Sequence, residues 1–171
     1  MTSSGPYTQS YNFTHMYNLG DYKGCLPKES FCENSLTGII NKHPDFTKFA
    51  YILKLANMED IYNSSQANFT VFVPSDQALA HLGNDIFINM DNAFARHFIK
   101  ASTLDRIITS ELLSDSPASY FVTRSLQNKL FISNINDRIQ INNNINVIHK
   151  DMKTDNGLIH VIDGLISLFV I

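Results

Sequence analysis

The sequence has few glycines, few cysteines and no excess of basic residues, and each shortage excludes a class of function. Seven glycines in 171 residues include no glycine-rich loop of the kind that holds a phosphate group. The net charge of −3 provides no basic surface for a phosphate backbone, so we expect no nucleic-acid binding. No apolar run approaches the roughly 20 residues that a transmembrane helix needs, so we predict no membrane span.

Motifs for catalysis are also missing. No histidine pair has the i, i+4 spacing with a glutamate that forms a metalloprotease helix, and no serine lies in a nucleophile-elbow pattern. We therefore predict a non-enzymatic protein with no catalytic residue, metal site or cofactor, and keep a hydrolase or metal enzyme as a third hypothesis. The histidines that such an enzyme would use are scattered: His15, His43, His81, His97, His149 and His160.

The two cysteines, Cys25 and Cys32, are seven positions apart in the least regular part of the chain. A disulfide between them would close a short loop and contribute about 2 kcal/mol. Without histidines nearby they do not form a zinc site. The loop-like setting favours a disulfide. Residues 1–9 lack the basic and apolar regions of a signal peptide, and the predicted absence of secretion favours free thiols.

The composition itself is typical of one globular domain. Hydrophobic residues make up 44% of the chain and charged residues 17%, which is unlike a disordered protein. The chain is long enough to bury a sizeable core. We divide it into residues 1–34, an extended arm rich in Tyr, Ser and Asn, and residues 35–171, a single domain.

Helix signals dominate the first part of this domain. Ser35 precedes a short helix that ends at His43 and Pro44, and Asp45 is positioned to cap a longer helix with an apolar face. Ser75 is expected to cap a helix over residues 76–82, and Asp91 to begin another. Strand-like alternation covers residues 69–73 before these last two helices.

The second part of the domain is β-like, with short alternating runs separated by asparagine-rich breaks. Helices first and strands later indicate an α+β domain. The expected strands cover residues 121–124, 129–133, 138–141, 146–149 and 158–163.

The last of these strands is the most informative. It follows Asn156-Gly157, a pair typical of a tight turn, and both of its faces are mostly apolar. Such a strand is covered on both sides, where His160 and Asp163 each need a hydrogen-bonding partner. We therefore predict structural roles for these two residues and not catalytic ones.

Two segments carry a resemblance to a known family. Residues 156–163, Asn-Gly-Leu-Ile-His-Val-Ile-Asp, resemble the second signature of the fasciclin-type (FAS1) adhesion domain, and residues 69–79, Phe-Thr-Val-Phe-Val-Pro-Ser-Asp-Gln-Ala-Leu, resemble the first. The resemblance extends over residues 35–168. It implies a FAS1-like wedge, a twisted β-sandwich of short strands with N-terminal and edge helices. The matching signature residues are Thr70, Phe72, Pro74, Asn156, Gly157, His160 and Asp163.

Two positions resemble the family's adhesion motifs. His97 matches the histidine of the central Tyr-His stretch, although Arg96 stands in place of the tyrosine. Asp151-Met152 resembles an Asp-Ile integrin-recognition core, which implies an integrin-type receptor as a partner, although Met152 stands in place of the isoleucine. The alternative to an adhesion role is a structural one for both residues. In that case we expect His97 to be a core histidine bonded to a backbone carbonyl and Asp151 to be a solvated turn residue. We also consider the apolar Phe169 and Ile171 as partner contacts.

Three triplets, beginning at Asn12, Asn63 and Asn68, fit the N-glycosylation pattern. In an asparagine-rich chain such triplets also arise by chance.

The leading functional hypothesis is adhesion or assembly through a protein partner or self-association, in a surface layer or in the virion of a large DNA virus. One face of such a domain can supply the roughly 1,600 Å² of a standard interface. The alternative is a small-ligand or glycan-binding module that uses a cleft of the same domain, which a large apolar pocket with a few polar groups would favour.

Overall fold

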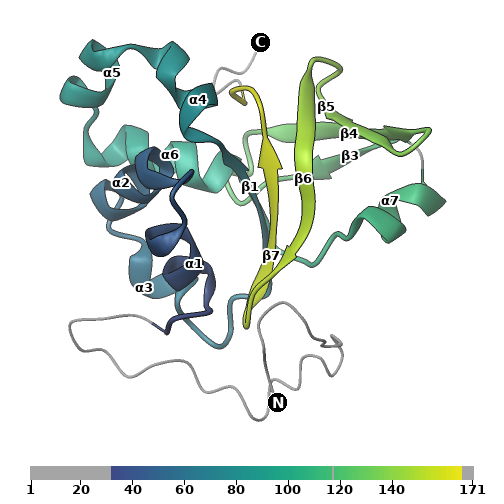
Figure 1. Ribbon diagram of the computed structural model, residues 1–171, viewed down its shortest axis with the longest axis horizontal. Helices are drawn as coiled ribbons and strands as arrows, with labels where there is room; N and C mark the ends of the chain where they lie inside the picture. Colours follow the sequence, from purple (N-terminus) through teal and green to yellow (C-terminus); the bar gives the residue numbers. More distant parts are fainter. Residues whose placement is uncertain (1–31, 117, 167–171) are drawn as a thin grey trace.

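The computed structural model describes residues 32–116 and 118–166, which form a group of helices beside a seven-stranded sheet (Figure 1). The α-helices are α1 (Leu36–Lys42), α2 (Thr47–Leu55), α3 (Glu59–Tyr62), α4 (Asp76–Leu79), α5 (Asn84–Asn89), α6 (Asn92–Ala101) and α7 (Ser110–Asp115), with the 3-10 helix η1 (Ala80–Leu82). The strands are β1 (Phe69–Pro74), β2 (Thr103–Leu104), β3 (Ala118–Val122), β4 (Lys129–Ile135), β5 (Arg138–Ile141), β6 (Ile145–Lys153) and β7 (Gly157–Ile162).

Side-chain caps begin three of the helices where the sequence predicts them. The Ser35 hydroxyl accepts a hydrogen bond from the Gly38 amide at 3.0 Å and starts α1. The Ser75 hydroxyl starts α4 in the same way. The Asp91 carboxylate accepts from the Phe94 amide at 2.8 Å and starts α6. Each cap satisfies an amide that the helix itself cannot pair.

The predicted cap of α2 is wrong. Asp45 does not cap this helix with its side chain; Asp76, from the first turn of α4, takes that place. Its carboxylate accepts from the Lys48 amide at 2.8 Å and from the Thr47 hydroxyl at 2.6 Å. The Asp45 carbonyl accepts from the Asp76 amide instead. The Lys48 amide is therefore capped by Asp76, 28 positions away in the sequence, and not by the neighbouring Asp45.

The sheet is organised around β1 and β7, which pair in parallel. Phe69 is opposite Gly157 and Phe72 is opposite His160, so the strand portions of the two signature segments are direct neighbours. The other five strand pairs are antiparallel. The complete order is β2-β1-β7-β6-β5-β4-β3, which leaves β2 and β3 at the two ends.

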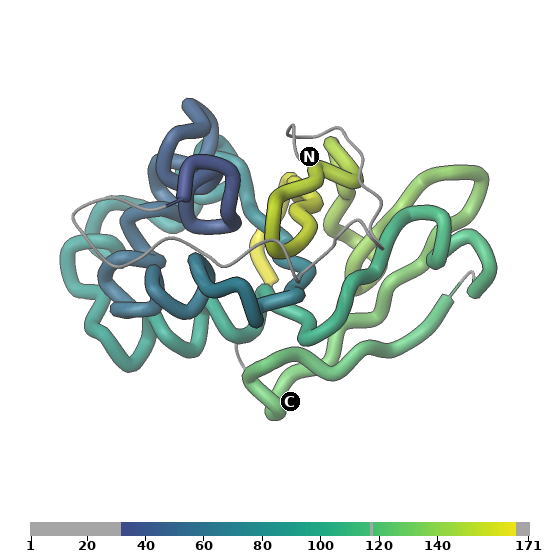
Figure 2. Tube along the Cα trace, turned by 90° about the horizontal axis from the view of Figure 1, so that it is seen from below, coloured from purple at the N-terminus to yellow at the C-terminus, as the bar shows by residue number. Residues whose placement is uncertain are grey.

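The β1–β7 pair separates two hydrophobic cores. Val71 and Val161 face the helices in one core, whereas Phe72 and Ile162 face β4 and β5 in the other. Every residue of β1 and β7 is buried, which confirms the prediction of strands covered on both sides. Figures 1 and 2 show this arrangement, with helices α1–α6 on one side of β7, and β3–β5 together with α7 on the other.

The strand boundaries show where local patterns fail. β5 has the predicted bounds, and β7 differs from its prediction by one residue at each end. The strand predicted over residues 121–124 is confirmed only in part: β3 covers Ala118–Val122, and the following residues turn back toward β4. The two-residue β2 was not predicted.

Candidate functional site

Asn156 joins two segments of the helical half to the start of β7. Its side-chain oxygen accepts from the Leu36 amide at 2.8 Å, and its side-chain nitrogen donates to the carbonyls of Tyr62 at 2.9 Å and Ser64 at 2.8 Å. Asn156 is 1% exposed. Water cannot reach its side chain, so these bonds satisfy polar groups that would otherwise be buried without a partner. The residue anchors the start of α1 and the end of α3 to the start of β7.

Gly157 and Asp163 border the same strand. A Cβ atom at Gly157 would lie 2.5 Å from the Phe69 carbonyl oxygen and 2.7 Å from a methyl carbon of Leu36, so only glycine fits without movement. The exposed Asp163 carboxylate accepts from the amide and the side chain of Asn146 at 2.8 and 3.1 Å. Both residues therefore have structural roles, as does Pro74 at the buried end of β1.

Thr70 and His160 hold the segment that follows β2. The Thr70 hydroxyl donates to the Arg106 carbonyl at 2.7 Å and accepts from the Ile108 amide at 2.8 Å. His160 Nε2 lies 2.8 Å from the Ile108 carbonyl, while its Nδ1 accepts from the Asp151 amide at 3.1 Å. Because Nδ1 is the acceptor, the ring is neutral and Nε2 carries the proton. Burial lowers the pKa of His160.

Asp151 is part of β6 and not the solvated turn residue of our structural interpretation. It is half-buried, has a φ of +58°, and lies at an irregularity in the β6–β7 register. Its carboxylate accepts from the Ser110 amide at 2.9 Å and from the Ser110 hydroxyl. Met152 packs half-buried against the helical core. Neither side chain is presented freely to a receptor.

His97 is less buried than the predicted core histidine, and its predicted bond to a backbone carbonyl stays a prediction. It is half-buried, and its Nδ1 lies 3.2 Å from the Ser125 hydroxyl. Arg96, in the position of the family's tyrosine, donates to the Ala56 carbonyl at 3.1 Å, where positive charge favours a helix C-terminus. This pair of residues joins α6 to two neighbouring segments.

Two of the three predicted N-glycosylation sites, Asn63 and Asn68, lie within the described residues. Asn63 is 7% exposed, and its side-chain oxygen accepts from the Cys32 amide and the Ser35 hydroxyl; glycosylation at this position stays a prediction. Asn68 is half-buried with a φ of +52°. The other predicted residues lie outside the described residues: Asn12, Cys25, Phe169 and Ile171. Pairing of Cys25 with Cys32 stays a prediction.

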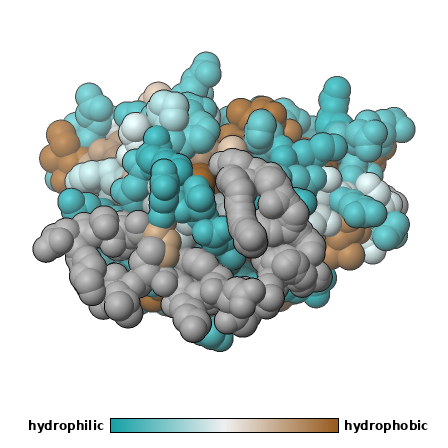
Figure 3. All heavy atoms as spheres, turned by 60° about the horizontal axis from the view of Figure 1, so that its bottom comes forward, coloured by the Kyte–Doolittle hydropathy of each residue, from teal (hydrophilic) through white to brown (hydrophobic). Residues whose placement is uncertain are grey.

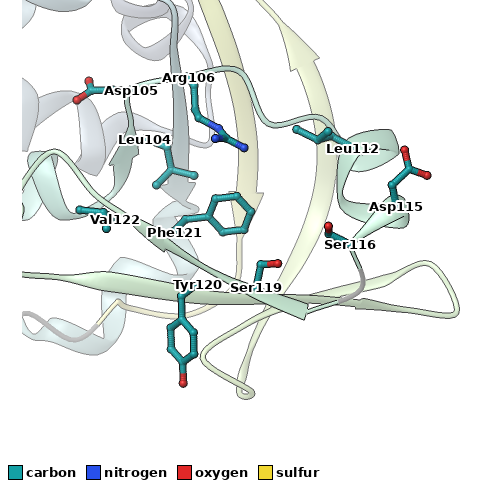
Figure 4. Close-up of a pocket in the computed structure, with 10 residues that line it drawn as sticks. All are labelled: Leu104, Asp105, Arg106, Leu112, Asp115, Ser116, Ser119, Tyr120, Phe121 and Val122. Carbon is teal, nitrogen blue, oxygen red and sulfur yellow. The ribbon is translucent and has the colours of Figure 1, made fainter.

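A groove of about 530 Å³ lies between β3, α7 and the segment after β2 (Figure 4). No sequence motif predicts this groove, because its three walls come from separate segments that meet only in the fold. Phe121 and Arg106 point toward each other across it, whereas the Tyr120 side chain points away on the opposite side of β3. The lining residues are Leu104, Asp105, Arg106, Leu112, Asp115, Ser116, Ser119, Tyr120, Phe121 and Val122.

Large apolar side chains are exposed both at the groove and elsewhere on the described surface. Figure 3 shows separate hydrophobic areas among mostly hydrophilic residues. Within residues 32–116 and 118–166, no group of three His, Cys, Asp or Glu residues is placed to hold a metal ion. None of the helices in these ranges is both long and apolar enough to cross a bilayer. The exposed side chains are Tyr51, Ile61, Ile86, Ile88, Phe94, Leu112, Tyr120, Val122, Leu126, Ile135 and Ile148.

Comparison with known proteins places this architecture among described families. The family model of the fasciclin domain matches residues 44–168. The fold is similar to the solved structure of a FAS1 domain pair from the insect cell adhesion molecule fasciclin I, with a TM-score of 0.65 and 21% identity. That match covers 84% of this chain and 57% of the other, so this chain spans little more than half of the pair. No curated protein matches the chain.

Proposed function

Because the chain belongs to the fasciclin domain family, we propose that it is a non-enzymatic adhesion or assembly protein that acts through contact with other proteins. The match to an insect cell adhesion molecule concerns the fold alone at 21% identity. The proposal therefore depends on how this chain uses its own residues.

One observation carries the proposal: the polar signature residues are occupied by internal bonds, while large apolar side chains remain exposed. Asn156, Thr70 and His160 direct their hydrogen bonds to backbone groups of the same domain. In contrast, Tyr120 is 70% exposed and Leu126 is 78% exposed. Exposed aromatic and apolar side chains are the groups that protein interfaces bury.

Bead clustering combined with sedimentation tests this proposal. We expect beads coated with the protein to cluster with one another, or to attach to cells, and the free protein to associate at concentrations of about 100 µM. Beads coated with an unrelated domain of equal net charge are the control. A protein that is monomeric at this concentration and whose beads neither cluster nor attach to cells would contradict the proposal.

Membership of a surface layer or of the virion of a large DNA virus is a finer form of the same proposal. Fractionation of the source material tests it, because the protein should travel with surface or particle fractions. Integrin-type recognition through Asp151 finds less support, since the Asp151 carboxylate already accepts two hydrogen bonds from Ser110.

A small-ligand or glycan-binding module is the second candidate, and the groove beside β3 is the observation that favours it. Its volume of about 530 Å³ lies within the range of small-molecule sites. Apolar and polar side chains line it together. Screening of soluble mono- and disaccharides by NMR, with shifts at Leu104 and Phe121 as the readout, separates this candidate from the first.

A further inference from the structure

We propose that the groove beside β3 binds an extended peptide segment of a partner protein, which adds to the sheet as an eighth strand. This inference rests on the proposed function, because it names the surface through which one protein contact would form. Three features carry it: the outward backbone groups of β3, the fixed wall opposite them, and the charges at the two ends of the groove.

The backbone of β3 presents hydrogen-bonding groups to the groove. Strand order places β3 at the end of the sheet, with β4 on its inner side. The Thr123 amide donates toward β4, to Asn128, whereas the next amide, of Arg124, donates to the opposite side, to Thr103. Because amides alternate in direction along a strand, those of Tyr120 and Val122 point to the same side as that of Arg124.

This alternation defines where an added strand would begin. The bond from the Arg124 amide to the Thr103 carbonyl, at 2.9 Å, joins the two ends of the sheet at one point. Beyond it, within the described residues, no strand pairs with the outer edge of β3. The strand also contains no charge and no proline, which are the usual protections of an exposed edge. An extended peptide would continue the pairing that Thr103 starts.

The wall opposite β3 is held rigidly by three side chains from the centre of the sheet. Thr70 from β1 and His160 from β7 bond to backbone groups of Arg106 and Ile108. Asp151 from β6 bonds to Ser110 at the start of α7. These contacts fix the wall before any ligand arrives, which lowers the cost of ordering on binding.

The charges of the groove specify the peptide. Arg106 lies over the Phe121 ring, 5.7 Å from its centroid, at the Val122 end, and Asp115 lines the other end. Within the described chain neither side chain forms an ion pair. The third charged residue of the lining, Asp105, is already paired with Arg124 at 2.8 Å, and the apolar residues of the lining include Leu104 and Leu112. The matching segment therefore has an acidic residue at one end, a basic residue at the other, and uncharged residues between.

Blocked hexapeptides test the proposal by NMR on the full chain. In acetyl-Asp-Val-Thr-Val-Thr-Lys-amide, antiparallel pairing with β3 places the acidic residue at Arg106; the reversed sequence, acetyl-Lys-Thr-Val-Thr-Val-Asp-amide, does so in parallel pairing. We expect one of the two to bind with a Kd on the order of 1 mM, as a weak strand addition. The amides of Tyr120 and Val122 should shift and exchange more slowly with solvent, whereas that of Ile148 should not.

Charge reversal sharpens the test. Arg106→Glu should weaken binding of the preferred peptide roughly threefold to tenfold and should strengthen binding of a version whose Asp is replaced by Lys. Arg138→Glu is the matched control, because Arg138 is also an exposed arginine of the sheet region but lies on β5, outside the groove lining. Circular dichroism checks that both variants remain folded.

Several results would overturn the proposal. Titration of both peptides to 10 mM without shifts in β3 would do so, as would equal responses of the Arg106→Glu and Arg138→Glu variants. Shifts in β3 that depend only on protein concentration would assign the edge to a second copy. Shifts with sugars but not with peptides would assign the groove to a small ligand. If peptide binding fails while protein-coated beads still cluster, the proposed function survives and this inference does not.

Discussion

The centre and the β3 end of the sheet use their polar groups in opposite ways. In the centre, the side chains of Thr70, Asn156 and His160 are at most 1% exposed and bond to backbone groups of distant segments. At the β3 end, Tyr120 and Val122 are exposed and their outward amides face a groove.

The two regions therefore have different roles: the centre defines the scaffold, and we propose that binding depends on the β3 end. The central residues match the family signatures because they join the helices, the sheet and the Arg106–Ser110 segment into one scaffold. A scaffold of this kind does not determine what is bound. The outer edge of β3 pairs with no described strand, and Arg106 and Asp115 form no ion pair within the described chain. We therefore propose that the choice of binding partner depends on residues at this end.

Removal of the Asn156 side chain from the centre of the sheet should lower the stability of the protein more than any other change considered below. Asn156→Ala leaves the Leu36 amide and the Tyr62 and Ser64 carbonyls without their partner. We expect the free energy of unfolding to fall by at least about 3 kcal/mol, because each is a buried or partly buried backbone group. Urea denaturation measures this. Asn144→Ala, at an exposed asparagine, should change it by less than about 0.5 kcal/mol; equal losses would refute the comparison.

Acid should weaken the centre through His160. Burial lowers the folded-state pKa of His160 below its usual 6.5, so the unfolded chain binds its proton first. The neutral ring contributes fully to the free energy of unfolding above pH 6.5. This contribution is lost as the pH falls below 6.5, by up to about 1.4 kcal/mol for each pH unit. We expect urea midpoints of the wild type to fall between pH 7 and 5. His160→Gln should show a smaller fall. A urea midpoint that depends on pH as steeply as that of the wild type would contradict the assignment of this pH dependence to His160.

Asp155 gives a smaller effect of opposite sign. Burial raises its pKa from 3.8 to about 6, although the charge of Lys42 opposes the shift. The folded state therefore holds the proton more tightly, and this stabilisation is present below pH 3.8 and lost as the pH rises through 6. Because the carboxyl group is partly exposed, we expect Asp155→Asn to stabilise the protein by only about 1 kcal/mol at pH 7. Thermal melts should show this gain at pH 7 but not at pH 4.

The same substitution in both regions gives the smallest expected effect at β3. Val122→Thr should change the free energy of unfolding by less than about 0.5 kcal/mol, because Val122 is 55% exposed. Val161→Thr, at a residue 4% exposed in the helical core, should cost roughly 1–3 kcal/mol through burial of a hydroxyl group. Similar values for the two variants in chemical denaturation would erase the distinction between the regions.

Local signals predicted much of the fold. The caps at Ser35, Ser75 and Asp91 and the covered strand after Asn156 depend on patterns within a few residues. The cap of α2 by Asp76 and the place of Asp151 beside Ser110 could not be predicted in this way. Both contacts join residues more than 25 positions apart, and nothing in the neighbouring sequence specifies them.

The candidate site was less predictable than the fold. The sequence drew attention to His97, Asp151 and Met152, yet Asp151 and Met152 are occupied within the domain. The groove was missed because Leu104, Leu112 and Phe121 come from three segments with no common motif. β2, one border of this region, has only two residues, too few for alternation to be recognised.

The parallel pairing of β1 with β7 also has a consequence for how the chain acquires its structure. Phe69 finds its partner at Gly157, 88 positions later, and this high contact order predicts slow folding. During synthesis neither core can close until β7 has left the ribosome, so the nascent helices and β1 expose apolar surface for that interval. A chain that stops before residue 157 should therefore engage chaperones or aggregate instead of forming a smaller stable unit.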